Sequence, residues 1–372
     1  MQSSLCRLAL FVLCVFAPVG AHAEGLFLTE DNLEYIAPEG QFPDRSCAPL
    51  YGAVDDVYRK NRVELAPEVR ERALKGDFNA LFALAALTRL EENTGRPPSS
   101  GAPAAFWEDW IVRMFGEKEA WYRLGVAASV LAPFDGMPKT ELQLMARRAL
   151  RKAADLGHPE AMYGMGILAE LQPDPDFRMP EDPGFPVIPR NIAEGNFRSD
   201  ESRYWMGAAA THGSSRANLH MGLVYQMEQF AVVNETESVK MLRNSMVMGN
   251  AVAARMLYAY FEPYMTAHSP TLANCKDSIY YFLLDTKMHS EKIEQVEIMA
   301  GHMIAGNNKL FPKACLTREQ YEEAMKKAEE EFNAIKASME EKKREHDALY
   351  ARAERMLPEL RAAFEAQAGG KC

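Results

Sequence analysis

The sequence predicts an all-α fold, an α-solenoid of helical hairpins followed by one long C-terminal helix. A pattern of small residues recurs about every 40 residues, a period typical of stacked helical hairpins. The last part of the chain repeats apolar residues at helical spacing over a long stretch. Hydrophobic residues make up 48% of the chain and charged residues 25%, which is the composition of a folded protein rather than a disordered one.

Residues 1–23 have the three parts of a secretory signal peptide. Arg7 lies in a short polar start, an apolar run covers residues 8–16, and a small-x-small cleavage motif ends at Ala23. The apolar run is shorter than the roughly 18 residues that a membrane span needs. We therefore expect cleavage after Ala23, a periplasmic location and no membrane span in the mature chain.

Five glycines anchor the recurring pattern, and we expect residues 24–68 to cap the first repeat. The glycines are Gly76, Gly116, Gly157, Gly213 and Gly249, and the residues four places later are Ala80, Ala120, Ala161, Ala217 and Ala253. Nine places after three of the glycines stand Gly125, Gly166 and Gly222. Each anchoring glycine is expected to end one helix in a left-handed cap, before a short turn and a second helix. The small residues are expected to let the two antiparallel helices of one hairpin approach closely, because larger side chains there would push them apart.

The expected solenoid, residues 69–265, is interrupted by a proline-rich insertion at 171–191. Six prolines exclude a helix there and favour an extended loop. The loop contains acidic and aromatic residues that suit a partner-binding surface, namely Asp174, Asp176, Phe177 and Phe185. The alternative is a loop that folds back on the solenoid and buries its phenylalanines at home.

Residues 266–315 are expected to form a degenerate hairpin that caps the stack, and residues 316–372 a long helix. Thr317 and Gln320 have the spacing of a capping box at the start of that helix. Apolar residues and alanines form a seam at positions 321, 325, 328, 332, 335, 339, 349, 353, 356, 360 and 364. The helix is expected to pack along the concave side of the solenoid, to self-associate, or to protrude toward a partner. The glutamates at 329–331 read as a solvated face.

Four cysteines remain after the leader is removed: Cys47, Cys275, Cys315 and Cys372. In an oxidising compartment they suggest one or two disulfides, with three possible full pairings. Cys275 and Cys315 flank the expected capping hairpin, so we favour a bridge between them. No cysteine lies near a histidine at zinc spacing, and no metal site is expected.

The charge of the mature chain constrains its partners. The leader contains one arginine and no acidic residue, which leaves 42 − 1 = 41 basic against 52 acidic residues, or 41 − 52 = −11. Such a chain repels the phosphates of nucleic acids and anionic lipid headgroups. A basic protein partner suits it better.

Two stretches carry a family resemblance, KAADLGHPEAMYGMGILAEL at 152–171 and GAAATHGSSRANLHMGLVY at 207–225. Both resemble the Sel-one-like repeat (SLR), a relative of the tetratricopeptide repeat, with its alanine pair, glycine, alanine and Met-Gly. The likeness covers at most residues 69–265. It implies an α-solenoid that holds other proteins and has no catalytic residues of its own.

No motif of an enzyme was found. HExxH, GxSxG, phosphate-binding and dinucleotide-binding patterns are all missing from the sequence. His158 and His212 read as turn residues and His220 as a core histidine. We therefore expect no catalytic residue, no cofactor and no enzymatic activity.

Two function classes remain. The resemblance implies a periplasmic protein-binding scaffold, since exported SLR proteins include immunity proteins that neutralise phospholipase effectors of the type VI secretion system. A regulator or adaptor that binds a sensor or envelope protein is the alternative within this class. An enzyme whose site is assembled in the groove from several repeats is the second and more remote class.

Overall fold

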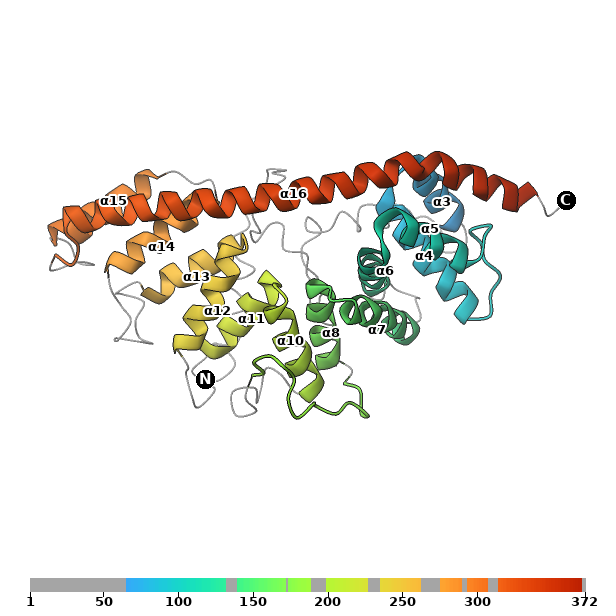
Figure 1. Ribbon diagram of the computed structural model, residues 1–372, viewed down its shortest axis with the longest axis horizontal. Coiled ribbons are helices and arrows are strands. Elements are labelled where there is room, and N and C mark those ends of the chain that lie inside the picture. Colours follow the sequence, from blue (N-terminus) through green and yellow to red (C-terminus); the bar gives the residue numbers. More distant parts are fainter. Residues whose placement is uncertain are drawn as a thin grey trace. The chain divides into compact units, whose positions relative to one another are not determined.

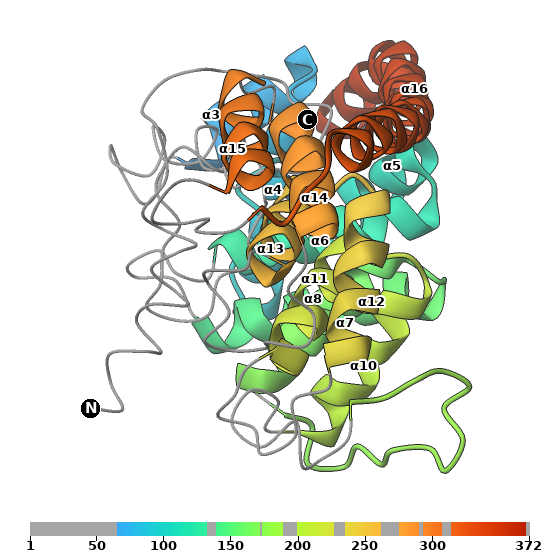
Figure 2. The ribbon, with the colours of Figure 1, turned by 90° about the vertical axis from the view of Figure 1, so that its left-hand side faces the viewer.

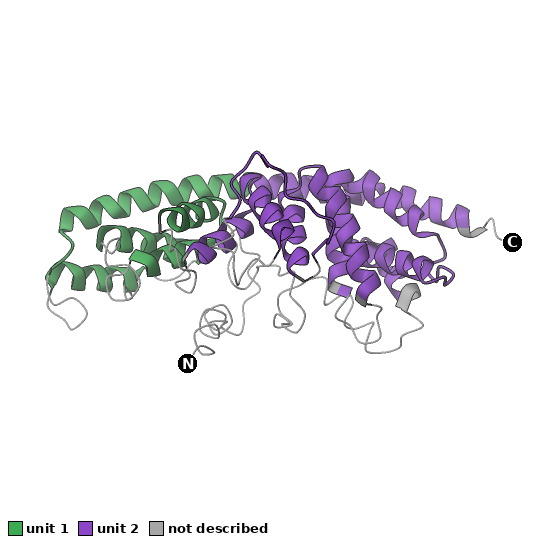
Figure 3. Ribbon diagram, turned by 90° about the horizontal axis from the view of Figure 1, so that it is seen from below, with its two compact units in different colours: residues 1–34, 234–341 green, residues 35–233, 342–372 purple. Residues whose placement is uncertain are grey.

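The computed structural model describes residues 65–131, 139–171, 173–188, 199–226, 235–261, 275–289, 293–306 and 314–369. The predicted signal peptide, most of the N-terminal cap region, Cys47 and Cys372 lie outside these ranges. Within them the chain forms helices and no strand, so the all-α class is confirmed. The chain divides into two compact units, residues 1–34 with 234–341 (unit 1) and residues 35–233 with 342–372 (unit 2), which Figure 3 colours separately.

The described residues of unit 2 form four helical hairpins. Their helices are α3 (Leu65–Lys75) and α4 (Phe78–Asn93), α5 (Ala104–Phe115) and α6 (Glu117–Leu131), α7 (Lys139–Asp155) and α8 (Pro159–Leu171), and α10 (Asp200–Thr211) and α11 (Ser215–Gln226). Successive hairpins pack on one another through α4 with α6, α6 with α7, and α8 with α10 (Figure 1). This stacking of neighbours in chain order is the arrangement of an α-solenoid.

Unit 1 contains a fifth hairpin and the predicted capping pair. The helices are α12 (Glu235–Val247), α13 (Ala251–Phe261), α14 (Cys275–Met288), α15 (Glu294–Ala305) and the first part of α16 (Arg318–Gly369). Helices α12 to α15 pack in chain order, and Figure 2 shows α13, α14 and α15 following one another. A disulfide between Cys275 and Cys315 joins the start of α14 to the segment that precedes α16.

The five anchoring glycines all lie between the two helices of a hairpin with positive φ. The values are +104° for Gly76, +80° for Gly116, +80° for Gly157, +94° for Gly213 and +91° for Gly249. In four of the turns the residue after the glycine donates its backbone N–H to a carbonyl five residues earlier, as in the bond from Ser214 to Ala209 at 2.9 Å. This is the Schellman pattern, which needs a left-handed residue and explains the glycine. Gly116 is the exception, because α6 starts directly after it.

The residue after the glycine also caps the second helix of the hairpin. Side chains of Asp77, His158 and Ser214 accept the backbone N–H of Ala80, Ala161 and Ala217 at 3.0, 3.2 and 3.1 Å. One turn thus closes two helix ends, the carbonyl end of the first by backbone and the N–H end of the second by a side chain. All five alanines of the pattern are buried.

The small residues nine places after the anchoring glycines make other contacts than expected. Gly125 of α6 lies against Leu150 of α7, and Gly166 of α8 lies against Met206 of α10. These contacts join one hairpin to the next and do not close a hairpin on itself. The prediction that the small residue nine places on lets the helices of one hairpin approach is therefore wrong for these two glycines.

The N-terminal part of α16 packs on unit 1. Its start has the predicted capping box: Thr317 Oγ1 accepts the N–H of Gln320 at 3.2 Å, and Gln320 Oε1 accepts the N–H of Thr317 at 2.9 Å. Met339 covers the turn at Gly249, where a Cβ would meet its sulfur. Met325, placed in the seam by its spacing, is exposed, and its neighbour Ala324 is buried instead.

The C-terminal part of α16 packs on unit 2 through aromatic and aliphatic side chains. Tyr350 contacts the rings of Phe78 and Phe115 at centroid distances of 5.6 and 5.3 Å. Phe364 lies 5.3 Å from the ring of Trp107, and Leu357 contacts the turn at Gly76. Residues 341–348 are all exposed. Each part of this helix thus packs on hairpins of its own chain.

Candidate functional site

The proline-rich loop, described over residues 173–188, folds back on α10. The rings of Phe177 and Phe185 both lie against Tyr204, at 5.5 and 5.1 Å between centroids. A Cβ at Gly207 would come within 2.4 Å of the Pro186 carbonyl oxygen, so the loop backbone touches the helix there. The loop thus folds back on the solenoid as in the alternative, but Phe177 and Phe185 are half-buried and not fully buried.

Two arginines and a buried glutamate hold this loop in place. Glu201 of α10 is 2% exposed and accepts bonds from Arg147 of α7 and from the backbone N–H of Asp174, the latter at 2.8 Å. Arg203 donates to the carbonyl of Ile188 at 2.7 Å. The loop is thus fixed near both of its described ends.

The acidic residues predicted to meet a partner lie on the outside of this loop. Asp174 and Asp176 are exposed, and Asp174 Oδ1 accepts the backbone N–H of Asp176 at 2.9 Å. Contact with a partner stays a prediction for these two residues and for Phe177 and Phe185.

His158 is a structural residue of a hairpin turn. Its Nδ1 accepts the Ala161 N–H, so its Nε2 carries hydrogen and donates to Glu119 Oε2 at 3.1 Å. Its ring stacks on Tyr122 with 4.2 Å between centroids. Burial would raise the pKa of Glu119, but the bond from His158 and the charge of Arg123 outweigh it and lower that pKa to about 2.

His212 ends α10, and His220 lies in α11. His212 Nδ1 is 2.9 Å from the carbonyl oxygen of Ala208, in its own helix end. Burial lowers the pKa of His220 to about 4, so its imidazole is neutral at physiological pH. Across the described residues no three potential metal ligands come together. The pKa shift of Glu119 is explained by its bond to His158 and the charge of Arg123, and that of His220 by burial.

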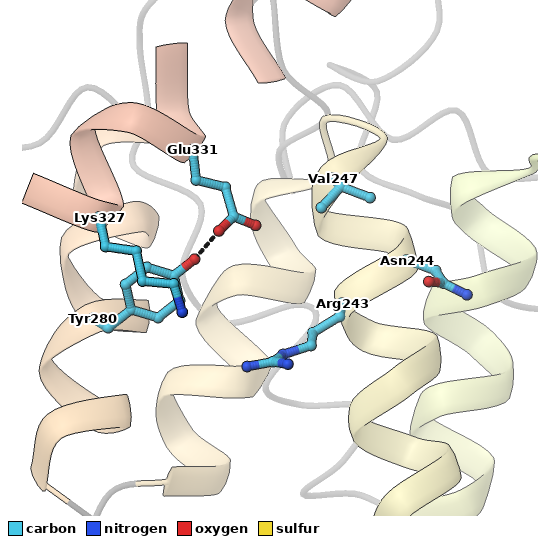
Figure 4. Close-up of a pocket in the computed structure, with 6 residues that line it drawn as sticks. All are labelled: Arg243, Asn244, Val247, Tyr280, Lys327 and Glu331. Carbon is cyan, nitrogen blue, oxygen red and sulfur yellow. Dashed lines mark hydrogen bonds between the residues drawn. The ribbon is translucent and has the colours of Figure 1, made fainter. Parts of the chain in front are cut away.

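One pocket in unit 1 gathers charged and polar side chains from three helices. It is lined by Arg243, Asn244 and Val247 of α12, Tyr280 of α14, and Lys327 and Glu331 of α16 (Figure 4). Its volume is about 150 Å³. We call it the α12–α14–α16 pocket.

Internal contacts fix the walls of this pocket. The Tyr280 hydroxyl donates to the Glu331 carboxylate, and Lys327 Nζ lies 4.6 Å from the centroid of the Tyr280 ring. Arg243 donates its Nε–H to the Tyr281 hydroxyl, with its guanidinium carbon 5.6 Å from the centre of that ring. These bonds orient one cation from α12 and one from α16 at the same pocket.

Tyr280 of the pocket wall and its neighbour Tyr281, which holds Arg243, both remain neutral. Burial, reinforced by the Glu331 carboxylate, raises the pKa of Tyr280 well above its usual value. Burial also raises the pKa of Tyr281 to about 12, against the opposing charge of Arg243. Both phenols thus keep their protons at neutral pH and add no charge to the pocket.

Sequence reasoning missed this pocket and misread part of it. The run Glu329–Glu331 is not a uniformly solvated face, because Glu331 accepts from Tyr280 and Glu329 pairs with Lys287 of α14. The lining residues come from segments that are far apart in the chain, and their convergence has no local signature. The spacing of Lys327 and Glu331, one helical turn apart, was the available signal.

Comparisons with known proteins extend only to solved structures. No protein-family model and no curated protein matches the chain. The chain is similar to a Sel1 repeat protein from Oxalobacter formigenes, with 16% identity and a TM-score of 0.35 over 71% of this chain and 99% of that one. It is also similar to a protective antigen of uropathogenic Escherichia coli strains that displays an SLR fold, with 17% identity and a TM-score of 0.27 over 87% of this chain and 69% of that one.

The description of this chain as a protein of glycine-capped helical hairpins rests on its own helices and turns. Of the helices in the described ranges, none combines the length and apolar character needed to cross a bilayer.

Proposed function

We propose that this chain is a non-enzymatic scaffold that binds another protein. The observation that carries the proposal is the way α16 is held: an amphipathic helix lies on the hairpin turns of its own chain, with Met339 at Gly249 and Leu357 at Gly76. Because glycine has no side chain, an apolar side chain of a helix that crosses such a turn can pack directly against it. The hairpins therefore already bind one helix.

Three other hairpin turns of unit 2 lack such a contact, and we call them the open turns. A Cβ at Gly116, Gly157 or Gly213 would meet no atom within 4 Å, in contrast to one at Gly76. Leu156 lies beside one of these open turns and is 45% exposed. We propose this row of turns, from α5 to α11, as the partner-binding face.

The charge of the chain and the predicted signal peptide limit the class of partner protein. The signal peptide predicted at 1–23 supports a periplasmic chain, and the formal charge of 41 − 52 = −11 expected after its removal supports a basic partner. Together with the resemblance to exported SLR proteins, these features support an immunity protein that neutralises a secreted phospholipase of the type VI system. A regulator or adaptor for a sensor or envelope protein is the second candidate, supported by the same surface.

The test is reconstitution with a candidate effector. We expect the mature chain to co-purify with a basic secreted phospholipase and to inhibit its activity, and we expect deletion of the gene to sensitise cells to that toxin. Leu156→Arg should weaken binding about tenfold or more, by placing a charge at the open turn. Ile298→Arg is the matched control, because Ile298 of α15 is 62% exposed and lies away from these turns in the chain.

Three outcomes would separate the candidates. Co-purification with a sensor domain in place of a phospholipase favours the regulator. Equal binding by Leu156→Arg and Ile298→Arg would show that the open turns are not part of the interface. Turnover of a small substrate by the purified chain alone contradicts the scaffold proposal.

A further inference from the structure

We infer that the α12–α14–α16 pocket binds a carboxylate that is carried on a small aliphatic group. A peptide C-terminus that ends in a small aliphatic residue and a short branched organic acid share this chemistry. The inference concerns a different part of the chain from the open turns and does not depend on the scaffold proposal.

The charges of the pocket match one carboxylate. Arg243 and Lys327 contribute two positive charges and Glu331 one negative charge. The Glu331 carboxylate already accepts the Tyr280 hydroxyl. Among the lining residues one positive charge remains, which one monovalent anion neutralises; Asp277, whose charge also acts on Arg243, lies outside the lining.

The donors of the pocket are placed for an anion. Arg243 uses its Nε–H for Tyr281, which orients the guanidinium and leaves the N–H groups of its two Nη atoms on the pocket side (Figure 4). A guanidinium edge binds a carboxylate through two parallel hydrogen bonds. Lys327 adds a further donor from α16, whereas Figure 4 shows the Asn244 side chain directed away from Arg243 and Lys327.

The size and the apolar wall limit the rest of the ligand. Val247 lies one turn after Arg243 on α12, lines the pocket and is 43% exposed. Covering it with a small alkyl group removes apolar surface from water. A volume of about 150 Å³ holds a carboxylate with a few carbon atoms and is smaller than the pockets of drug-sized ligands.

The experiment is a titration of the mature, oxidised protein with three probes, followed by ligand-observed NMR. The probes are acetyl-alanyl-valine as the free acid, the same dipeptide as its C-terminal amide, and isovalerate. We expect the free acid to bind and the amide to bind at least about tenfold more weakly, because the amide lacks the charge that pairs with Arg243. Isovalerate binding as tightly as the dipeptide acid identifies a small organic acid as the ligand, and weaker binding identifies a peptide terminus.

Variants connect the binding to the pocket. Arg243→Gln and Lys327→Gln should each weaken acid binding about tenfold or more, while Lys326→Gln, an exposed neighbour on α16 that pairs with Glu330, should leave it unchanged. Arg243→Lys keeps the charge without the two-pronged edge and should fall between them. Circular dichroism melts check that each variant is folded. Equal binding of acid and amide, no binding up to about 10 mM, or unchanged binding in both glutamine variants overturns the inference.

Discussion

Gly125 of α6 faces Leu150 of α7 so closely that a Cβ at position 125 would lie 2.6 Å from Leu150 Cγ and 3.1 Å from its backbone nitrogen. The contact joins two hairpins. Gly125→Ala should therefore destabilise the protein by about 1–3 kcal/mol, because the helices must separate to admit one methyl group. Urea unfolding followed by circular dichroism measures the change.

Gly301 is the matched control for that substitution. It lies inside α15, and a Cβ there would meet no atom within 4 Å. Gly301→Ala should stabilise the protein by up to about 1 kcal/mol, since alanine is the better helix former. The same sign for both substitutions would contradict the proposed role of Gly125.

Acid should weaken the fold through Glu119. The pKa of this group is lowered to about 2 in the folded chain from 4.5, so its stabilisation is fully present above pH 4.5 and is lost as the pH falls toward 2. The difference corresponds to about 3 kcal/mol at most. Glu119→Gln should lose stability at pH 7 and show a flatter decline between pH 4.5 and 2 in thermal melts. Glu322 pairs with Arg318 on the exposed face of α16. The stability of Glu322→Gln should therefore fall with pH as that of the unmodified protein does.

The disulfide should stabilise unit 1. It links residues 40 apart, for which the loss of chain entropy in the unfolded state amounts to about 4 kcal/mol. Reductant should lower the melting temperature of the unmodified protein, while the double variant Cys275→Ser/Cys315→Ser should melt early and be insensitive to reductant. A reductant effect of equal size in the double variant would assign the stabilisation to another bridge.

Leu357 should hold the C-terminal part of α16 on unit 2. It is 7% exposed and contacts the turn at Gly76, so Leu357→Ala should cost about 2–5 kcal/mol of local stability. Hydrogen exchange should speed up at residues 349–369 and not at residues 321–339, which pack on unit 1. Glu359→Ala, an exposed substitution two residues away, should leave both stretches unchanged.

The fold class and the hairpin turns could be predicted from the sequence because they depend on residues that are close together in the chain. A left-handed glycine followed by a capping residue is set by neighbours in the chain, as at Gly213 and Ser214, so it leaves a mark in a short window. The start of α16 at Thr317 and Gln320 is equally local. The Cys275–Cys315 bridge was one favoured pairing among several, and the structure contains it.

Contacts between hairpins were less accessible. The partner of Gly125 lies 25 residues away, and nothing in its own helix indicates whether the missing side chain makes room for the previous helix or the next. The position of Met325 shows the same difficulty, because Ala324 is buried in its place and the spacing alone does not tell which of the two faces the hairpins. The α12–α14–α16 pocket combines residues 243 to 331 and is visible only in three dimensions.

Eight consecutive residues of α16, from 341 to 348, are exposed on every side of the helix. A fluorophore, affinity tag or photocrosslinker attached at Lys343 would therefore replace no packed side chain. The chain thus contains a natural attachment point for labels, flanked on both sides by helix that packs on hairpins of its own chain.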